Sequence, residues 1–96
     1  MNPGWVYIVT NKPRGVLYVG VTSDLEGRIW EHRNHIHRGF TDSYNCSRLV
    51  WYDDYDDITD AIHREKRLKF WKRDWKIRLI EEMNPRWDDL FETIMS

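Results

Sequence analysis

The segment Trp5-Val6-Tyr7-Ile8-Val9-Thr10-Asn11-Lys12-Pro13-Arg14-Gly15-Val16-Leu17-Tyr18-Val19-Gly20-Val21-Thr22 decides the fold. Two runs rich in β-branched and aromatic residues, 6–10 and 16–22, flank a short stretch that carries Asn, Pro and Gly. Runs of the first kind favour extended strands, and Asn, Pro and Gly favour turns. The segment therefore predicts a β-hairpin.

Helical and strand patterns follow the hairpin along the chain. Ser23 stands three residues before Glu26, which is typical of a capping box, and apolar spacing then predicts a helix over about 24–35 with an inward stripe of Leu25, Ile29, His32 and Ile36. Residues 39–47 predict a loop, and residues 48–55 predict a third strand. Residues 59–83 lack Pro and Gly and predict one long helix or two helices broken near 72–74, and residues 87–95 predict a short closing helix.

This order of elements, ββαβ and then helices, predicts an α+β fold with a small three-stranded, largely antiparallel sheet flanked by helices. With 96 residues, the chain is expected to form a single domain, 1–96. Its six tryptophans are expected to supply large pieces of the core.

Composition limits the classes of protein to consider. Hydrophobic residues at 41% and charged residues at 32% are typical of a globular chain rather than a disordered one. The longest apolar run is far short of a membrane span, and no signal-like pattern opens the chain, so we expect no membrane association. A single cysteine, Cys46, excludes an internal disulfide and favours a cytoplasmic location.

The net charge of −1 hides an uneven distribution of charge. Eight basic residues lie between Arg64 and Arg78 and interleave with Phe70, Trp71 and Trp75. This mixture suits contact with phosphates together with base stacking. The same pattern is also expected of a helix whose aromatic residues lie in the core and whose basic residues face solvent. The candidate nucleic-acid-binding residues are Lys66, Lys69, Lys72, Arg73 and Lys76.

Glu65 is the most informative charged residue. At about 100° per residue it falls in the middle of an apolar helical stripe formed by Ile58, Ala61, Ile62 and Leu68. A carboxylate on the core side of a helix needs a cation, a metal ion or hydrogen-bond donors. The spacing alone does not decide whether Glu65 forms a salt bridge, for example to Arg28, binds a metal ion or acts as an acid–base group.

Arg28 and His32 lie four residues apart and therefore on one helix face. Arg28 is suited to bidentate phosphate contact, and His32 is suited to proton transfer near neutral pH. Each residue also has a structural interpretation: Arg28 as a surface charge and His32 as a partly buried packing residue. Tyr7 and Tyr18 lie inside the predicted strands, where an aromatic residue is usually part of the core.

Trp5-Val6-Tyr7 followed eleven residues later by Tyr18-Val19-Gly20 resembles the paired motif of the GIY-YIG nucleases. The resemblance runs from about Trp5 to Trp71 and places Arg28, His32 and Glu65 at the family's other catalytic positions. It implies that Glu65 holds one Mg²⁺ or Mn²⁺ ion and that one of the two tyrosines acts as the general base. We assign the base role to Tyr7 and the positioning of water or metal to Tyr18, and the resemblance leaves the reverse assignment open. Two positions depart from the pattern: Trp5 stands where glycine is usual, and Lys76-Ile77-Arg78 stands where the family often carries asparagine.

The resemblance implies a metal-dependent endonuclease that cuts phosphodiester bonds in DNA rather than RNA, in repair, recombination or processing. A protein partner could supply specificity, because so short a chain has no room for a separate recognition domain. The alternative is a non-catalytic nucleic-acid-binding or protein-interaction module on the same fold. A zinc site built from His32, His35, His37 and Cys46 has no spacing typical of tetrahedral coordination.

Overall fold

Three antiparallel strands form the centre of the structure, which is a computed structural model that describes residues 2–36 and 39–95. The strands are β1 (Gly4–Thr10), β2 (Leu17–Thr22) and β3 (Arg48–Tyr55), and β1 lies between the other two. Tyr7 is paired with Gly20 on one side and with Tyr52 on the other. The predicted hairpin, third strand and α+β class are confirmed.

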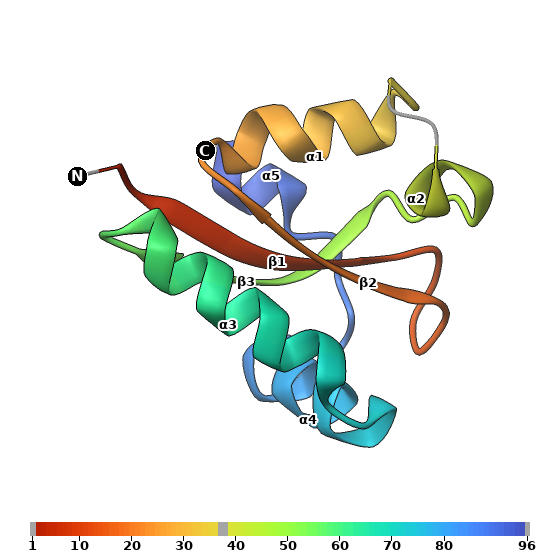
Figure 1. Cartoon of the computed structure of the whole chain (residues 1–96). Helices are drawn as coiled ribbons and strands as arrows, with labels where there is room; N and C mark the ends of the chain where they lie inside the picture. The colour runs from red at the N-terminus through yellow and green to blue at the C-terminus, as the bar shows by residue number, and fades with distance from the viewer. Residues whose placement is uncertain (1, 37–38, 96) are drawn as a thin grey trace.

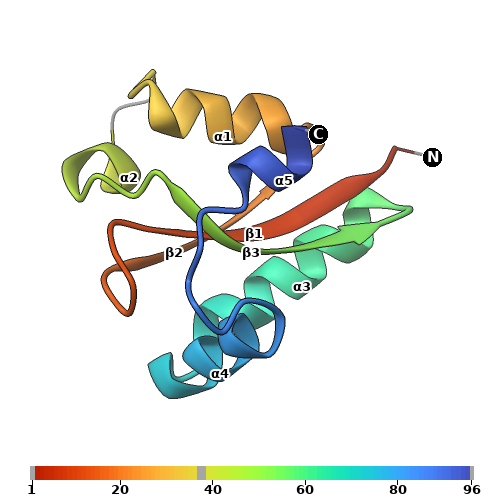
Figure 2. The same ribbon diagram turned by 180° about the vertical axis from the view of Figure 1, so that it is seen from behind.

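Helices cover both faces of the sheet, as Figures 1 and 2 show from opposite sides. Successive side chains of a strand point to opposite faces, so Val6 and Ile8 pack in one core cluster and Tyr7 and Val9 in another. Helices α3 (Ile58–Phe70) and α4 (Arg73–Met83) cover the first face, and α1 (Leu25–Arg33) and α5 (Phe91–Met95) cover the second. Among the described residues, none of the helices combines the length and the apolar composition that a membrane span requires.

The start and end of α1 differ from the prediction. Asp24, not Ser23, is the N-cap, because its Oδ1 accepts a hydrogen bond from the backbone N of Gly27 at 3.1 Å. The helix ends at Arg33, and Ile36 is exposed. The inward stripe therefore stops at His32, and the placement of Ile36 in that stripe was wrong.

The segment predicted as a loop contains a one-turn helix, α2 (Phe40–Ser43). Its turn is closed by backbone hydrogen bonds from Ser43 to Gly39 at 2.9 Å and from Tyr44 to Phe40 at 3.0 Å. A single turn is too short to produce a periodic pattern, so the loop prediction missed it.

The long helical stretch is two helices, because Trp71 and Lys72 both have extended backbone conformations. Of the two alternatives that the sequence left open, the structure has the second, two helices with a break between them. The closing helix begins only at Phe91, since the preceding segment turns at Pro85 and at Trp87, whose φ is 58°.

The tryptophans contribute less to the core than expected. Trp51 and Trp87 are buried, but Trp30 and Trp75 are about half exposed. Phe70 is 91% exposed, so the interpretation of Phe70 and Trp75 as core residues is wrong. A two-faced sheet this small has room for the inward stripe of each helix, and an aromatic residue off that stripe stays at the surface.

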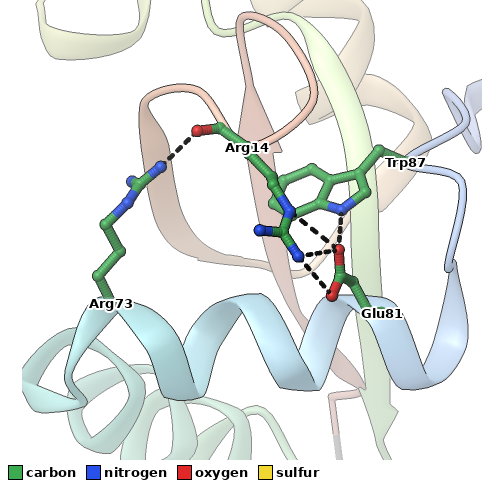
Figure 3. Close-up of polar contacts among 4 residues, drawn as sticks. All are labelled: Arg14, Arg73, Glu81 and Trp87. Atoms are coloured by element: carbon green, nitrogen blue, oxygen red, sulfur yellow. Dashed lines mark hydrogen bonds and ion pairs between the residues drawn. The ribbon is translucent and has the colours of Figure 1, made fainter.

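An ion-pair network fastens the hairpin turn to α4 (Figure 3). The Arg14 guanidinium lies 3.2 Å from Glu81, whose Oε2 also accepts a hydrogen bond from Trp87 Nε1 at 2.8 Å. The Trp87 hydrogen bond and Arg14 together lower the pKa of Glu81. Arg73, a candidate nucleic-acid contact, donates from Nη2 to the carbonyl oxygens of Arg14 and Gly15 at 2.5 and 2.7 Å. Its guanidinium therefore supports the turn.

Candidate active site

Tyr7 lies in the central strand with 1% of its surface exposed. Its hydroxyl is 2.9 Å from Nε2 of His32. Burial raises the pKa of Tyr7 well above its ordinary value, the neighbouring Tyr18 raises it further, and Arg28 opposes the shift. The Tyr7 hydroxyl is therefore protonated at neutral pH, and His32 is the group in position to receive its proton.

His32 is held at both ring nitrogens. While Nε2 meets Tyr7, Nδ1 lies 3.1 Å from the Oγ1 of Thr41 in α2. If Nε2 accepts from the Tyr7 hydroxyl, the neutral ring carries its proton on Nδ1 and donates it to Thr41. Sequence reasoning missed Thr41, because a hydroxyl in an expected loop gives no signal of a partner nine residues earlier.

Gly20 leaves room for the Tyr7 ring. It is the residue paired with Tyr7 across β1 and β2, and a Cβ there would lie 2.4 Å from both Cζ and the hydroxyl oxygen of Tyr7. The last residue of the Tyr18-Val19-Gly20 motif is therefore required by the position of Tyr7.

Gly20→Ala is expected to lower the free energy of unfolding by about 1–3 kcal/mol, because the ring must move to admit the methyl group. Denaturant unfolding of the variant and of the same change in a Tyr7→Leu background would measure this. The cost should shrink when the ring is absent. An equal cost in both backgrounds would contradict the steric explanation.

Tyr18 lies on the edge strand β2 and contacts residues of both α1 and α3. It is half-buried on the same face as Tyr7, and its ring centroid lies 6.1 Å from that of His32. The Nζ of Lys69, from α3, lies 5.8 Å from the Tyr18 ring centroid. Tyr18 is thus in contact with the His32 side and the Glu65 side of the site.

Glu65 lies on the inward side of α3, as its periodicity predicts. Its side chain is only 13% exposed, and Ala61 and Leu68 on the same stripe are fully buried. The carboxylate Oε2 pairs with Lys69 Nζ at 3.1 Å. The suggested salt bridge between Glu65 and Arg28 is absent from the ion pairs of the described residues, because Lys69 is one helical turn away on the same helix.

Arg28 lies at the other end of this group of residues, beside Glu31. Its Nε is 3.7 Å from Glu31 Oε1, which is too long for a hydrogen bond. The guanidinium is partly exposed, and it is close enough to Tyr7 to oppose the rise in that residue's pKa. A phosphate oxygen would therefore meet a guanidinium that is only loosely paired.

The five residues predicted from sequence thus lie in one region of the structure, linked through the contacts of His32 with Tyr7 and Tyr18 and of Lys69 with Tyr18 and Glu65. Tyr18, Arg28 and Glu65 all act on the pKa of Tyr7, and His32 contacts the Tyr7 hydroxyl. Glu31 also raises the pKa of Tyr7 and was not anticipated from the sequence, where it is one acidic residue among many.

The candidate nucleic-acid-binding residues separate into groups. Lys69 and Lys76 line one groove together with Tyr18 and Phe40. Burial lowers the pKa of Lys76, and the charges of Arg73 and Lys69 lower it further. Lys66 is exposed on α3, Lys72 is exposed in the break between α3 and α4, and Arg73 supports the hairpin turn.

Metal-binding side chains are sparse in the described ranges. No group of three or more His, Cys, Asp or Glu side chains gathers there that could hold an ion. His35 pairs with Asp42 at 2.8 Å, Cys46 is buried, and His37 lies outside the described residues. Glu65 is a hard oxygen ligand in a partly open position, so a magnesium-like ion there would take its other ligands from water and phosphate.

Comparison with known proteins agrees with this geometry. The model of the GIY-YIG catalytic domain matches residues 3–78. A UPF0213 protein of Staphylococcus saprophyticus is 34% identical over 82 residues, which cover 85% of this chain and 99% of that protein. UPF0213 proteins of Staphylococcus aureus and Staphylococcus epidermidis are 32% and 30% identical with the same coverage. No solved structure matches. The family match over most of the chain and the motif tyrosines gathered with Arg28, His32 and Glu65 show that this protein belongs to the GIY-YIG family of nuclease-type domains.

Proposed function

We propose that this protein is a divalent-metal-dependent endonuclease that hydrolyses phosphodiester bonds in DNA, in repair, recombination or processing. The observation that carries the proposal is the contact of the Tyr7 hydroxyl with His32, which packs beside Tyr18. Glu65 is joined to this group through Lys69, whose ammonium lies over the Tyr18 ring, and the charges of Arg28 and Glu65 act on the pKa of Tyr7. Hydrolysis of a phosphodiester needs a group that binds the phosphate, a base for the attacking water and positive charge near the developing negative charge. Arg28 can bind the phosphate, and Tyr7 with His32 can provide the base. Glu65 can hold a cation that provides the positive charge.

Arg28 is assigned to phosphate binding. Its loose pairing with Glu31 leaves the planar guanidinium able to exchange that carboxylate for two phosphate oxygens.

Tyr7 and His32 are assigned to proton transfer. A tyrosine whose pKa is raised by burial is a poor base alone, but Tyr7 can take a proton from water as it gives its own to His32 Nε2, 2.9 Å away. Thr41 fixes the ring for this transfer by its contact with Nδ1. Tyr18, more exposed than Tyr7, positions water beside this pair.

Glu65 is assigned as the protein ligand of one Mg²⁺ or Mn²⁺ ion. Such an ion, when bound, would polarise the scissile phosphate and stabilise the leaving oxygen. Lys69 neutralises the Glu65 carboxylate in the structure, and its ammonium is free to turn to the DNA backbone when another cation takes that place.

The test is cleavage of end-labelled single-stranded, duplex and branched DNA with Mg²⁺ or Mn²⁺. We expect cleavage of at least one substrate, loss of cleavage in EDTA and recovery when the metal is added in excess. If folded protein binds DNA but cuts none of the substrates with either metal, the protein is a binding module on this fold and the nuclease proposal fails.

A further inference from the structure

An aromatic stack leads from the candidate active site to the surface. The rings of Tyr18 and Phe40 are stacked, with centroids 5.9 Å apart and an angle of 29° between their planes. The Phe40 and Tyr44 rings follow with centroids 4.6 Å apart. Phe40 and Tyr44 are 47% and 51% exposed, so the stack, which begins beside His32, is open to solvent at its far end.

The hydrophobic core does not account for Phe40 and Tyr44, because neither side chain is part of it. Phe40 belongs to neither core cluster, and Tyr44 follows α2 at its C-cap. Large aromatic side chains left half in solvent next to one another form an apolar surface that usually has a binding partner.

Positive charge borders the same surface. Phe40 and Tyr18 line a groove whose other polar members are Lys69 and Lys76. The ammonium of Lys69 lies over the Tyr18 ring, where it is also paired with Glu65 at 3.1 Å, and the ammonium of Lys76 is partly desolvated beside two other cations. The nearest acidic residue of α2, Asp42, is paired with His35 at 2.8 Å. Aromatic faces next to lysines match a nucleic-acid strand, which offers base faces and phosphates in turn.

We propose that Tyr18, Phe40 and Tyr44 form a stacking platform for an unpaired base of the substrate, with Lys69 and Lys76 on its phosphates. This inference rests on the proposed nuclease function, because it places the base next to the phosphate that would be cut. Bases inside a duplex are covered by their neighbours, so the platform takes a single strand, a frayed end or a base displaced from a duplex.

The experiment measures DNA binding by fluorescence anisotropy in EDTA, where a metal-dependent enzyme does not cut. Three labelled probes of equal length are used: a single strand, the same strand with abasic sites at its centre, and the duplex. The variants are Phe40→Ala and Tyr44→Ala, Phe40→Trp as the conservative replacement, and Phe70→Ala as the matched control, since Phe70 is 91% exposed and lies outside the groove.

We expect Phe40→Ala and Tyr44→Ala each to weaken binding of the intact single strand by about 5- to 150-fold, the range for loss of one stacked base. Binding of the abasic strand and the duplex should change less than twofold, and Phe40→Trp and Phe70→Ala should bind like the wild type. The proposal is overturned if the wild type binds intact and abasic strands equally, or if Phe70→Ala weakens binding as much as Phe40→Ala.

This result is independent of cleavage. Binding that prefers intact bases and depends on Phe40, in a protein that cuts no DNA, would support the platform and reject the nuclease function. Cleavage that is unchanged in Phe40→Ala and equal on all three probes would support the nuclease and reject the platform.

Discussion

Glu65→Gln is expected to lower the rate of metal-dependent DNA cleavage by at least about 100-fold while the fold is kept. The side chain keeps its size, but the neutral amide loses the charge that a hard divalent cation requires. A bound cation contributes several kcal/mol of transition-state stabilisation, and about 1.4 kcal/mol corresponds to a tenfold change in rate. The measurement is cleavage of the best wild-type substrate over a range of Mn²⁺ concentrations.

Stability should change little in Glu65→Gln. Lys69 is 48% exposed on the side-chain scale, so its pair with Glu65 is screened by solvent and contributes about 0–1 kcal/mol. The matched control is Glu82→Gln, which removes the same charge from an exposed position on α4. If both variants cut DNA as fast as the wild type, Glu65 is a structural carboxylate that pairs with Lys69 and the metal assignment is wrong.

The sequence predicted those parts of this fold that depend on repeated patterns. The hairpin, the third strand and the two long helices each contain enough residues to show a period of 2 or 3.6, and the inward placement of Glu65 follows from the same period. The approach of Tyr7 to His32 was not visible in this way, because it depends on how α1 packs on the sheet. The motif resemblance supplied that relationship.

Features that depend on a single turn or on contacts between distant segments could not be predicted. α2 is one turn long and was not expected, so neither the contact of its Thr41 with His32 nor the stacking of its Phe40 on Tyr18 could be anticipated. The pairing of Glu65 with Lys69 rather than Arg28 was also open, because both arginine and lysine are plausible partners for an inward carboxylate until the helices are placed.

Tyr7→Phe is expected to lower cleavage by about 100- to 10,000-fold, the usual contribution of a general base, if Tyr7 passes its proton to His32. The ring keeps its place over Gly20, so loss of the hydroxyl costs about 0.5–1.5 kcal/mol of stability through the hydrogen bond to Nε2. DNA binding in EDTA should be unchanged. Tyr18→Phe is the comparison: a larger loss of cleavage there than in Tyr7→Phe would assign the base to Tyr18.

The pH dependence of stability provides a second readout of the Tyr7 hydroxyl that does not need activity. Burial raises the pKa of Tyr7 in the folded state above the value of about 10 that a tyrosine has when unfolded.

Below pH 10 both the folded and the unfolded state keep the Tyr7 proton, and the stabilising effect is fully present. Above about pH 10 the unfolded state loses the proton first, so the wild type loses up to about 1.4 kcal/mol of unfolding free energy per pH unit. Phenylalanine has no proton to lose, so the stability advantage of the wild type over Tyr7→Phe should shrink as pH rises from about 9 to 11 in urea unfolding. A constant difference over that range would mean that the Tyr7 hydroxyl is not held in its protonated form by the fold.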